Sequence, residues 1–216
     1  MKQPFLKLFF GLMTLLLALS VAAQEMTAPD VLVKSVADEV LHSLRTDKDL
    51  QNGDVKKAME LVDNKILPHF DFEAMTADTV GKANWRAASA QQKQRLIGEF
   101  KMLLVRTYAT SLSSYKSQTI RFKPLKLDPA DTAVLVRSEI LQPGGQPVQA
   151  DYLMEKGEKA WKVVDVRFAG ISLAANYKTT FAQEVSNGGV DGLIDYLVRR
   201  NKELDAKRAK NDKSAK

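Results

Sequence analysis

Three stretches decide the fold, and each alternates apolar with polar residues: TAVLVRSEIL at 132–141, VQADYLMEK at 148–156 and WKVVDVRF at 161–168. Because successive side chains of a β-strand point to opposite faces of a sheet, this period of two predicts strands with one buried face. A shorter stretch, TIRF at 119–122, has the same period and ends before Pro124, which cannot donate a ladder hydrogen bond. Four strands are therefore expected.

Two turns join the longer strands. PGGQP at 143–147 and EKGEK at 155–159 are rich in residues that favour tight turns. Consecutive strands joined by short turns pair antiparallel, so we expect a meander with one covered face. In the simplest phase Trp161, Val163 and Asp165 lie on the opposite face. The positions expected to face inward are Ile120, Phe122, Val134, Val136, Ile140, Ala150, Tyr152, Met154, Val164, Val166 and Phe168.

The period changes to three and four on both sides of these strands, which is typical of amphipathic helices. The longest helix is expected from Ser89 to about Tyr115; at roughly 40 Å it is long enough to cross a whole sheet. Gly188 and Gly189 are expected to interrupt the helices after the sheet. Helical patterns cover about 29–45, 54–67, 71–75, 89–115, 173–187 and 190–197. The prediction is an α+β fold, with a twisted four-stranded antiparallel sheet wrapped by about six to seven helices.

The first 23 residues are expected to be a cleaved signal peptide. Two lysines precede an apolar run at 8–22, and small residues end it; this order is that of a secretory signal. A retained membrane anchor is the alternative, but the run is shorter than the ~20 residues that span a bilayer. Residues 24–204 are then expected to form one domain, and residues 205–216 a basic, disordered tail.

The formal net charge of +6 is unevenly distributed along the chain. Residues 202–216 hold six Lys or Arg against three Asp or Glu, and two further lysines lie in the expected signal peptide. The remaining body is close to neutral, which argues against nucleic acid as a partner, because phosphate binding needs a basic surface. The chain has no cysteine. Disulfides and thiolate chemistry are therefore excluded, and export without disulfides is compatible with a periplasmic location.

Side chains for catalysis or metal binding are sparse. His42 and His69 are the two histidines, and no His, Asp or Glu cluster has the spacing of a metal site. No glycine-rich phosphate loop and no Gly-x-Ser-x-Gly motif occurs. Asp165 is the best acid candidate, but a hydrogen-bonded structural carboxylate is the favoured interpretation. The sequence therefore predicts no cofactor, no metal and no enzyme activity.

Several segments, taken in order, resemble the MlaC family. ILPHFDFEAM at 66–75 is similar to that family's Pro-x-Phe-Asp-Phe segment. The other matches are loose individually, but their order and spacing together are specific and cover roughly 31–197. These further segments are Gly81-x-x-x-Trp85, 91–100, Leu104-x-x-x-Tyr108, Asp151-Tyr152, 161–166, 170–173 and 188–194.

The resemblance implies a periplasmic, non-enzymatic carrier of phospholipid in the Mla pathway, which maintains outer-membrane lipid asymmetry and is linked to toluene tolerance. It implies partners at both membranes: an outer-membrane lipoprotein–porin complex, and an inner-membrane ABC transporter with MCE domains that the carrier serves as an auxiliary component. The implied fold is a twisted sheet like that of nuclear-transport-factor-2 (NTF2-like) domains. Acyl chains would enter between sheet and helices, with the headgroup at the mouth.

The phase of the strands and helices then predicts which residues contact lipid. The eleven inward strand positions named above would form one wall of an apolar pocket. Leu104, Tyr108, Leu173, Tyr177 and Phe181 would close it from the helices. Large apolar and aromatic residues at these positions are also what an ordinary core contains, so periodicity alone does not separate pocket from core.

Two other functions remain open at this point. A periplasmic chaperone or adaptor for hydrophobic protein segments would show an exposed groove and would bind peptide. A small-molecule enzyme would need an acid–base pair inside the cavity, whereas strand phase places Asp165 on the outer face. The favoured reading of the sequence is a phospholipid carrier.

Overall fold

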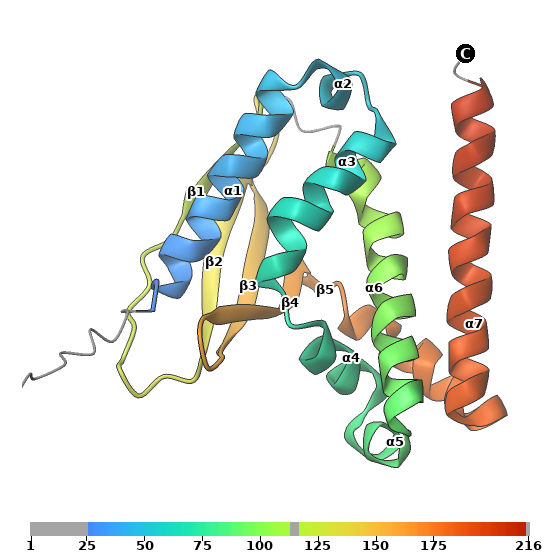
Figure 1. Cartoon of the computed structure of the whole chain (residues 1–216). Coiled ribbons are helices and arrows are strands. Elements are labelled where there is room, and N and C mark those ends of the chain that lie inside the picture. Colours follow the sequence, from blue (N-terminus) through green and yellow to red (C-terminus); the bar gives the residue numbers. More distant parts are fainter. Residues whose placement is uncertain (1–25, 113–116, 215–216) are drawn as a thin grey trace, which may run out of the picture.

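A computed structural model describes residues 26–112 and 117–214 as an α+β fold (Figure 1). The strands are β1 (Thr119–Phe122), β2 (Ala133–Leu141), β3 (Val148–Lys156), β4 (Trp161–Phe168) and β5 (Ile171–Ser172). They form one antiparallel sheet in the order β1-β2-β3-β4-β5. The prediction of four strands is wrong, because β5 is too short to show a period. The likeness to nuclear-transport-factor-2 domains stays a prediction, and the expected signal peptide lies outside the described residues.

Seven α-helices and three short helical turns accompany the sheet within the described residues. The helices are α1 (Pro29–Thr46), α2 (Lys48–Gln51), α3 (Val55–Leu61), α4 (Phe72–Val80), α5 (Lys82–Ala87), α6 (Ala90–Leu112) and α7 (Lys178–Ser214). The turns are η1 (Val62–Ile66), η2 (Leu67–His69) and η3 (Ala175–Tyr177). The number of helices agrees with the prediction. The part of the expected long helix beyond residue 112 includes positions 113–116, which lie outside the described residues.

Polar side chains begin several helices, as the sequence indicates. The Asp54 carboxylate accepts from the backbone N–H of Lys57, and that of Asp71 accepts from Ala74. Ser89 and Gln92 exchange hydrogen bonds of 2.9 and 3.2 Å and form a capping box before α6. At α1 there is no side-chain cap, because Ala28 occupies the cap position and Pro29 begins the helix.

The helix that lies along the sheet is α1, and the expected long helix lies elsewhere. Figure 1 shows α1 against the strands, with α6 beside α7 on the other side of the molecule. Val33 of α1 packs with Val136 and Trp161 of the sheet. The apolar face of α6 is instead buried against α4 and α7, where Phe100 and Phe181 meet at 5.0 Å between ring centroids.

A register shift between β3 and β4 changes which residues of β4 face inward. Tyr152 pairs with Val166, but Met154 pairs with Val163, so β4 carries one extra residue at this point. Such a β-bulge moves the following side chains to the other face. Val163 therefore shares a buried cluster with Met154 and Trp161. The predicted phase is wrong for Val164, which was expected to face inward, and for Trp161 and Val163, which were expected on the opposite face.

The C-terminal helix is longer than expected. α7 continues to Ser214, so the disordered tail expected at 205–216 is helical up to that residue. Asp205 forms an ion pair of 2.8 Å with Arg106 of α6. The side-chain amide of the buried Asn201 donates a hydrogen bond to the backbone carbonyl of Glu99. The expected interruption is confirmed, because Gly189 has a φ of 66° within α7.

The outer face of the sheet is polar. Glu139 forms ion pairs of 2.6 Å with Arg121 and 2.7 Å with Lys123, and these two cations hold the pKa of Glu139 at about 2. Asp165 accepts a hydrogen bond of 2.8 Å from Ser172 of β5. The Ser172 hydroxyl in turn accepts from the backbone N–H of Ala175, so Ser172 links β4 to the start of η3.

The turn between β4 and β5 holds an alanine in a left-handed conformation. Phe168 pairs with Ile171, so Ala169 and Gly170 form a two-residue turn with φ values of 49° and 80°. An L-residue pays roughly 1–2 kcal/mol for this conformation, whereas Gly and Asn adopt it readily. The strain lies at residue 169.

We expect Ala169→Asn to raise the free energy of unfolding by about 0.5–1 kcal/mol, because Asn-Gly is the favoured pair for this turn. Gly170→Ala should lower it by about 1 kcal/mol; no atom lies within 4 Å of the added Cβ, so only backbone strain contributes. Urea denaturation followed by circular dichroism measures both. Equal stabilities of the two variants would contradict this account.

Candidate functional site

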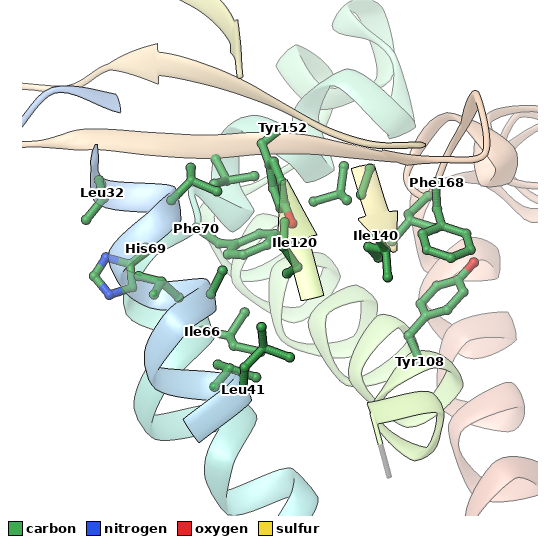
Figure 2. A pocket seen from close by; sticks show the side chains of 18 of the residues that line it. Leu32, Leu41, Ile66, His69, Phe70, Tyr108, Ile120, Ile140, Tyr152 and Phe168 are labelled. Atoms are coloured by element: carbon green, nitrogen blue, oxygen red, sulfur yellow. The ribbon is translucent and has the colours of Figure 1, made fainter. Parts of the chain in front are cut away.

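A cavity of about 440 Å³ lies between α1, the inner face of the sheet, α6 and the segment before α4 (Figure 2). Its wall is almost entirely apolar. The lining residues are Leu32, Val33, Val36, Ala37, Val40, Leu41, Leu44, Ile66, His69, Phe70, Tyr108, Ile120, Ile140, Ala150, Tyr152, Met154, Val163, Val166, Phe168 and Leu173. Small-molecule sites have volumes of about 300–1,000 Å³. The cavity lies within this range and therefore has room for apolar chain.

The two ends of the cavity differ. Val33, Met154 and Val163 line it and also belong to a buried cluster with Trp161, so this end is closed. At the other end Phe168 lines the cavity and is 38% exposed, and its cross-strand partner Ile171 is 61% exposed. Figure 2 shows Phe168 and Tyr108 together at this side, with Leu32 and His69 at the opposite side. The cavity is thus an apolar blind channel with its open end beside the β4–β5 turn.

Three lining side chains carry polar atoms, namely His69, Tyr108 and Tyr152. Burial lowers the pKa of His69 below its ordinary value of 6.5, the nearby Lys162 ammonium lowers it further, and Glu39 opposes them. The imidazole is therefore neutral at pH 7. Both charged neighbours of His69 also bind other groups. Glu39 forms an ion pair of 2.9 Å with Lys65, and Lys162 donates a hydrogen bond to the backbone carbonyl of Pro68.

Tyr108 faces the cavity from α6. Burial raises the pKa of its phenol, and the neighbouring Tyr177 raises it further. Tyr108 is therefore a neutral hydrogen-bonding group at every physiological pH. No lining residue other than His69 could carry a charge, so the wall offers no ion pair to a ligand.

Nine of the sixteen predicted site residues line the cavity. They are Tyr108, Ile120, Ile140, Ala150, Tyr152, Met154, Val166, Phe168 and Leu173. The other seven lie elsewhere. Val134 and Val136 are buried under the first turns of α1 with Phe122 beside them, and Leu104 and Phe181 are buried between α6 and α7, with Tyr177 packed against them. Val164 is displaced by the bulge in β4.

The sequence did not predict that α1 lines the cavity. The apolar stripe of that helix is visible in the sequence, but a stripe shows that a face is buried and does not show what it faces. Ile66, His69 and Phe70 were also missed, although they lie in the segment that carries the family resemblance. Val163 was missed because alternation does not reveal a bulge within two adjacent valines.

The described residues contain no grouping of three or more His, Cys, Asp or Glu side chains suited to a metal ion. Asp165 is absent from the cavity wall, and its hydrogen bond to Ser172 fits the structural role expected for it. Across residues 26–112 and 117–214, none of the helices combines the length and the apolar character needed to span a bilayer.

An antiparallel sheet that shares an apolar cavity with the helices beside it defines an α+β protein with room for a hydrophobic ligand. Which protein of this class it is follows from comparison with known sequences. The family model described as MlaC protein matches residues 34–199, and the chain belongs to that family.

Similar proteins agree with this assignment. The intermembrane phospholipid transport system binding protein MlaC of Haemophilus influenzae is 26% identical over 197 residues, covering 90% of this chain and 91% of the relative. The toluene tolerance protein ttg2D of Pseudomonas putida is 27% identical over 184 residues, 84% of each chain. A phospholipid-binding protein from Ralstonia solanacearum, solved in complex with a phospholipid, is 40% identical with a TM-score of 0.76. That match covers 81% of this chain and 97% of the other.

The lowered pKa of His69 gives the stability of this site a predictable pH dependence. The unfolded chain binds a proton at the ordinary pKa of 6.5, above the folded value. The free energy of unfolding should be highest above pH 6.5 and should fall as the pH drops from 6.5 through the folded pKa.

We expect His69→Gln to flatten this fall between pH 7.5 and 5, measured by urea denaturation at half-unit steps. His42→Gln, which removes an exposed imidazole from the outer side of α1, is the matched control. A pH dependence in the His69 variant as steep as in the wild type would contradict the assignment.

Proposed function

We propose that this chain is a periplasmic carrier that moves single phospholipid molecules between membranes and holds acyl chain in the cavity against α1. The observation that carries the proposal is the cavity itself: seventeen of its twenty lining residues are wholly apolar, one end is closed and the other is open. The names of the Haemophilus and Ralstonia proteins, which transport and bind phospholipid, support the same ligand.

The energetics of lipid transfer explain why such a cavity is needed. About 30 chain methylenes at ~0.8 kcal/mol each place a phospholipid roughly 24 kcal/mol above its membrane state when it is in water. The apolar wall of the cavity removes acyl chain from water and so lowers this cost.

The proposed route has four parts. Residues 1–23 direct export and are then removed, and the mature chain acts in the periplasm without catalysis. It exchanges lipid with an outer-membrane lipoprotein–porin complex and with an inner-membrane ABC transporter bearing MCE domains. In this role it serves outer-membrane lipid asymmetry and, with it, tolerance to solvents such as toluene. The family membership and the relatives' names support this route.

The direct test is to express the full chain with its own N-terminal segment, purify it from the periplasm and extract it with organic solvent. Mass spectrometry is expected to detect phospholipid at close to one molecule per chain. Co-purified peptide without phospholipid would instead favour a chaperone for hydrophobic segments. Recovery of the protein without any lipid would count against the carrier.

A filled cavity should hold less lipid. Ala150 lines the cavity and is 3% exposed, so Ala150→Trp places an indole in the space that an acyl chain would occupy. We expect a severalfold loss of bound phospholipid with an unchanged circular dichroism spectrum. Ala133→Trp adds the same side chain at an exposed position of the same sheet and should retain the lipid. Full lipid content in a folded Ala150→Trp protein would contradict the assignment of this cavity.

A further inference from the structure

The C-terminal part of α7 presents positive charge on the outside of the molecule. Residues 199–210 contain six Lys or Arg against two Asp or Glu. Figure 1 shows this part of α7 at the edge of the molecule, with α6 between it and the strands. Leu197, Asn201 and Leu204 are the residues that it buries or half-buries on the side of α6. Its opposite side is therefore the outer surface of the helical layer.

Four cations gather on this outer side. Because an α-helix has 3.6 residues per turn, positions 199, 202, 206 and 210 lie one above another on one face. Arg199, Lys202 and Lys210 occupy three of these positions, Lys207 flanks them, and all four side chains are exposed. At 1.5 Å per residue they extend over about 17 Å. These four residues are called the basic row below.

The two carboxylates of the same segment already have cationic partners. Glu203 forms an ion pair with Arg200, which is outside the basic row. Asp205 forms an ion pair of 2.8 Å with Arg106 of α6. Both acids of residues 199–210 are thus matched by other arginines, and the basic row keeps a net positive charge.

The helix dipole accounts for only part of the row. Cations within the last turn of a helix stabilise it through the macrodipole. Arg199 and Lys202, however, lie at least roughly three turns before Ser214, where α7 ends. The segment also lies on the body of the protein, because Arg208 contacts the Met59 sulfur of α3 at 2.8 Å. The row is therefore a fixed feature of the surface.

The chemistry of the row favours a lipid surface over a protein partner. Protein interfaces place aromatic or apolar residues at their centre and are depleted in lysine. Among the described residues, the exposed large apolar side chains all lie outside α7; they are Val31, Leu127, Phe168 and Ile171. Anionic headgroups require only positive charge within reach, and each Lys or Arg near them strengthens binding roughly fivefold.

We propose that the basic row of α7 docks the protein on the anionic headgroups of a phospholipid bilayer. The contact is electrostatic and superficial, because the row has no large apolar side chain to insert. None of the described residues of α7 lines the cavity, so docking uses no part of the lipid site. The inference rests on the proposed function only in that a lipid carrier meets bilayers.

The test is co-sedimentation of protein purified from the periplasm with vesicles. The vesicles contain either phosphatidylcholine alone or equimolar phosphatidylcholine and phosphatidylglycerol, which is anionic. Binding is measured at low ionic strength and again with about 0.3 M sodium chloride, which screens exposed charges. The row variant combines Arg199→Gln, Lys202→Gln, Lys207→Gln and Lys210→Gln. The matched control removes four exposed lysines from other elements, with Lys82→Gln, Lys126→Gln, Lys156→Gln and Lys159→Gln combined.

We expect the wild type to bind the anionic vesicles, to bind the neutral vesicles much more weakly, and to dissociate in high salt. The row variant should bind the anionic vesicles at least about tenfold more weakly. The control variant has the same net charge and should bind like the wild type. Both variants should keep the circular dichroism spectrum and the phospholipid content of the wild type, because neither set of substitutions touches the cavity wall.

Equal weakening in the row and control variants would overturn the proposal, because net charge alone would then explain the binding. Salt-insensitive binding to neutral vesicles would overturn it as well. If the wild type ignores anionic vesicles and Lys202 or Lys207 instead cross-links to an acidic protein, the row is a protein interface and the proposal is wrong. A wild type that binds vesicles but contains no phospholipid would overturn the carrier and leave the docking intact.

Discussion

The structure depends on how the inner face of one antiparallel sheet is covered. Sheet faces of this kind must be removed from water, and the usual solution is a layer of helices packed directly on them. Here α1 alone lies along the strands, and its first turns close only one end, where Val33 meets Met154, Val163 and Trp161. The larger helices α6 and α7 bury their apolar faces against each other. Helix α1 therefore covers the sheet along its length, but side chains do not fill all of the space between them. The cavity is the part of that space that remains.

The protein keeps this space because its apolar residues form separate clusters. One cluster joins α1 to the sheet, a second joins α4, α6 and α7, and a third joins the end of α1 to α2 and α3. Phe70 packs against the first two clusters and forms a bridge with Val163, and the next residue, Asp71, donates its backbone N–H to the Val163 carbonyl at 2.9 Å. The segment that most resembles the family is thus where the helical layer is fastened to the sheet.

Much of the fold follows from local patterns. Alternation predicts β1 to β4 and their pairing, and Asp54, Asp71 and Ser89 mark helix starts. Each of these features depends on only a few neighbouring residues of the chain. The errors occur where the deciding contact is distant. Val163 and Val164 are chemically identical, and only the pairing with β3 decides which one faces the cavity. Leu104 and Tyr108 lie one turn apart on α6, yet Leu104 is core and Tyr108 is cavity wall. Periodicity identifies the buried side of an element, but the partner on that side is set by tertiary packing.

The sparse polar chemistry of the cavity suits the proposed carrier, which must also release its lipid. An acyl chain of about 15 methylenes at ~0.8 kcal/mol each is stabilised in an apolar channel by roughly 12 kcal/mol relative to water. A membrane gives the same chain a comparable environment, so this large term nearly cancels when lipid passes between protein and bilayer. The balance is then set by the few polar contacts at the open end. A cradle of charged groups would add several kcal/mol and slow release, because affinity differences of this kind appear mainly in the dissociation rate. The neutral Tyr108 hydroxyl on the wall can contribute about one hydrogen bond, which is enough to orient a lipid in the channel and too little to trap it there.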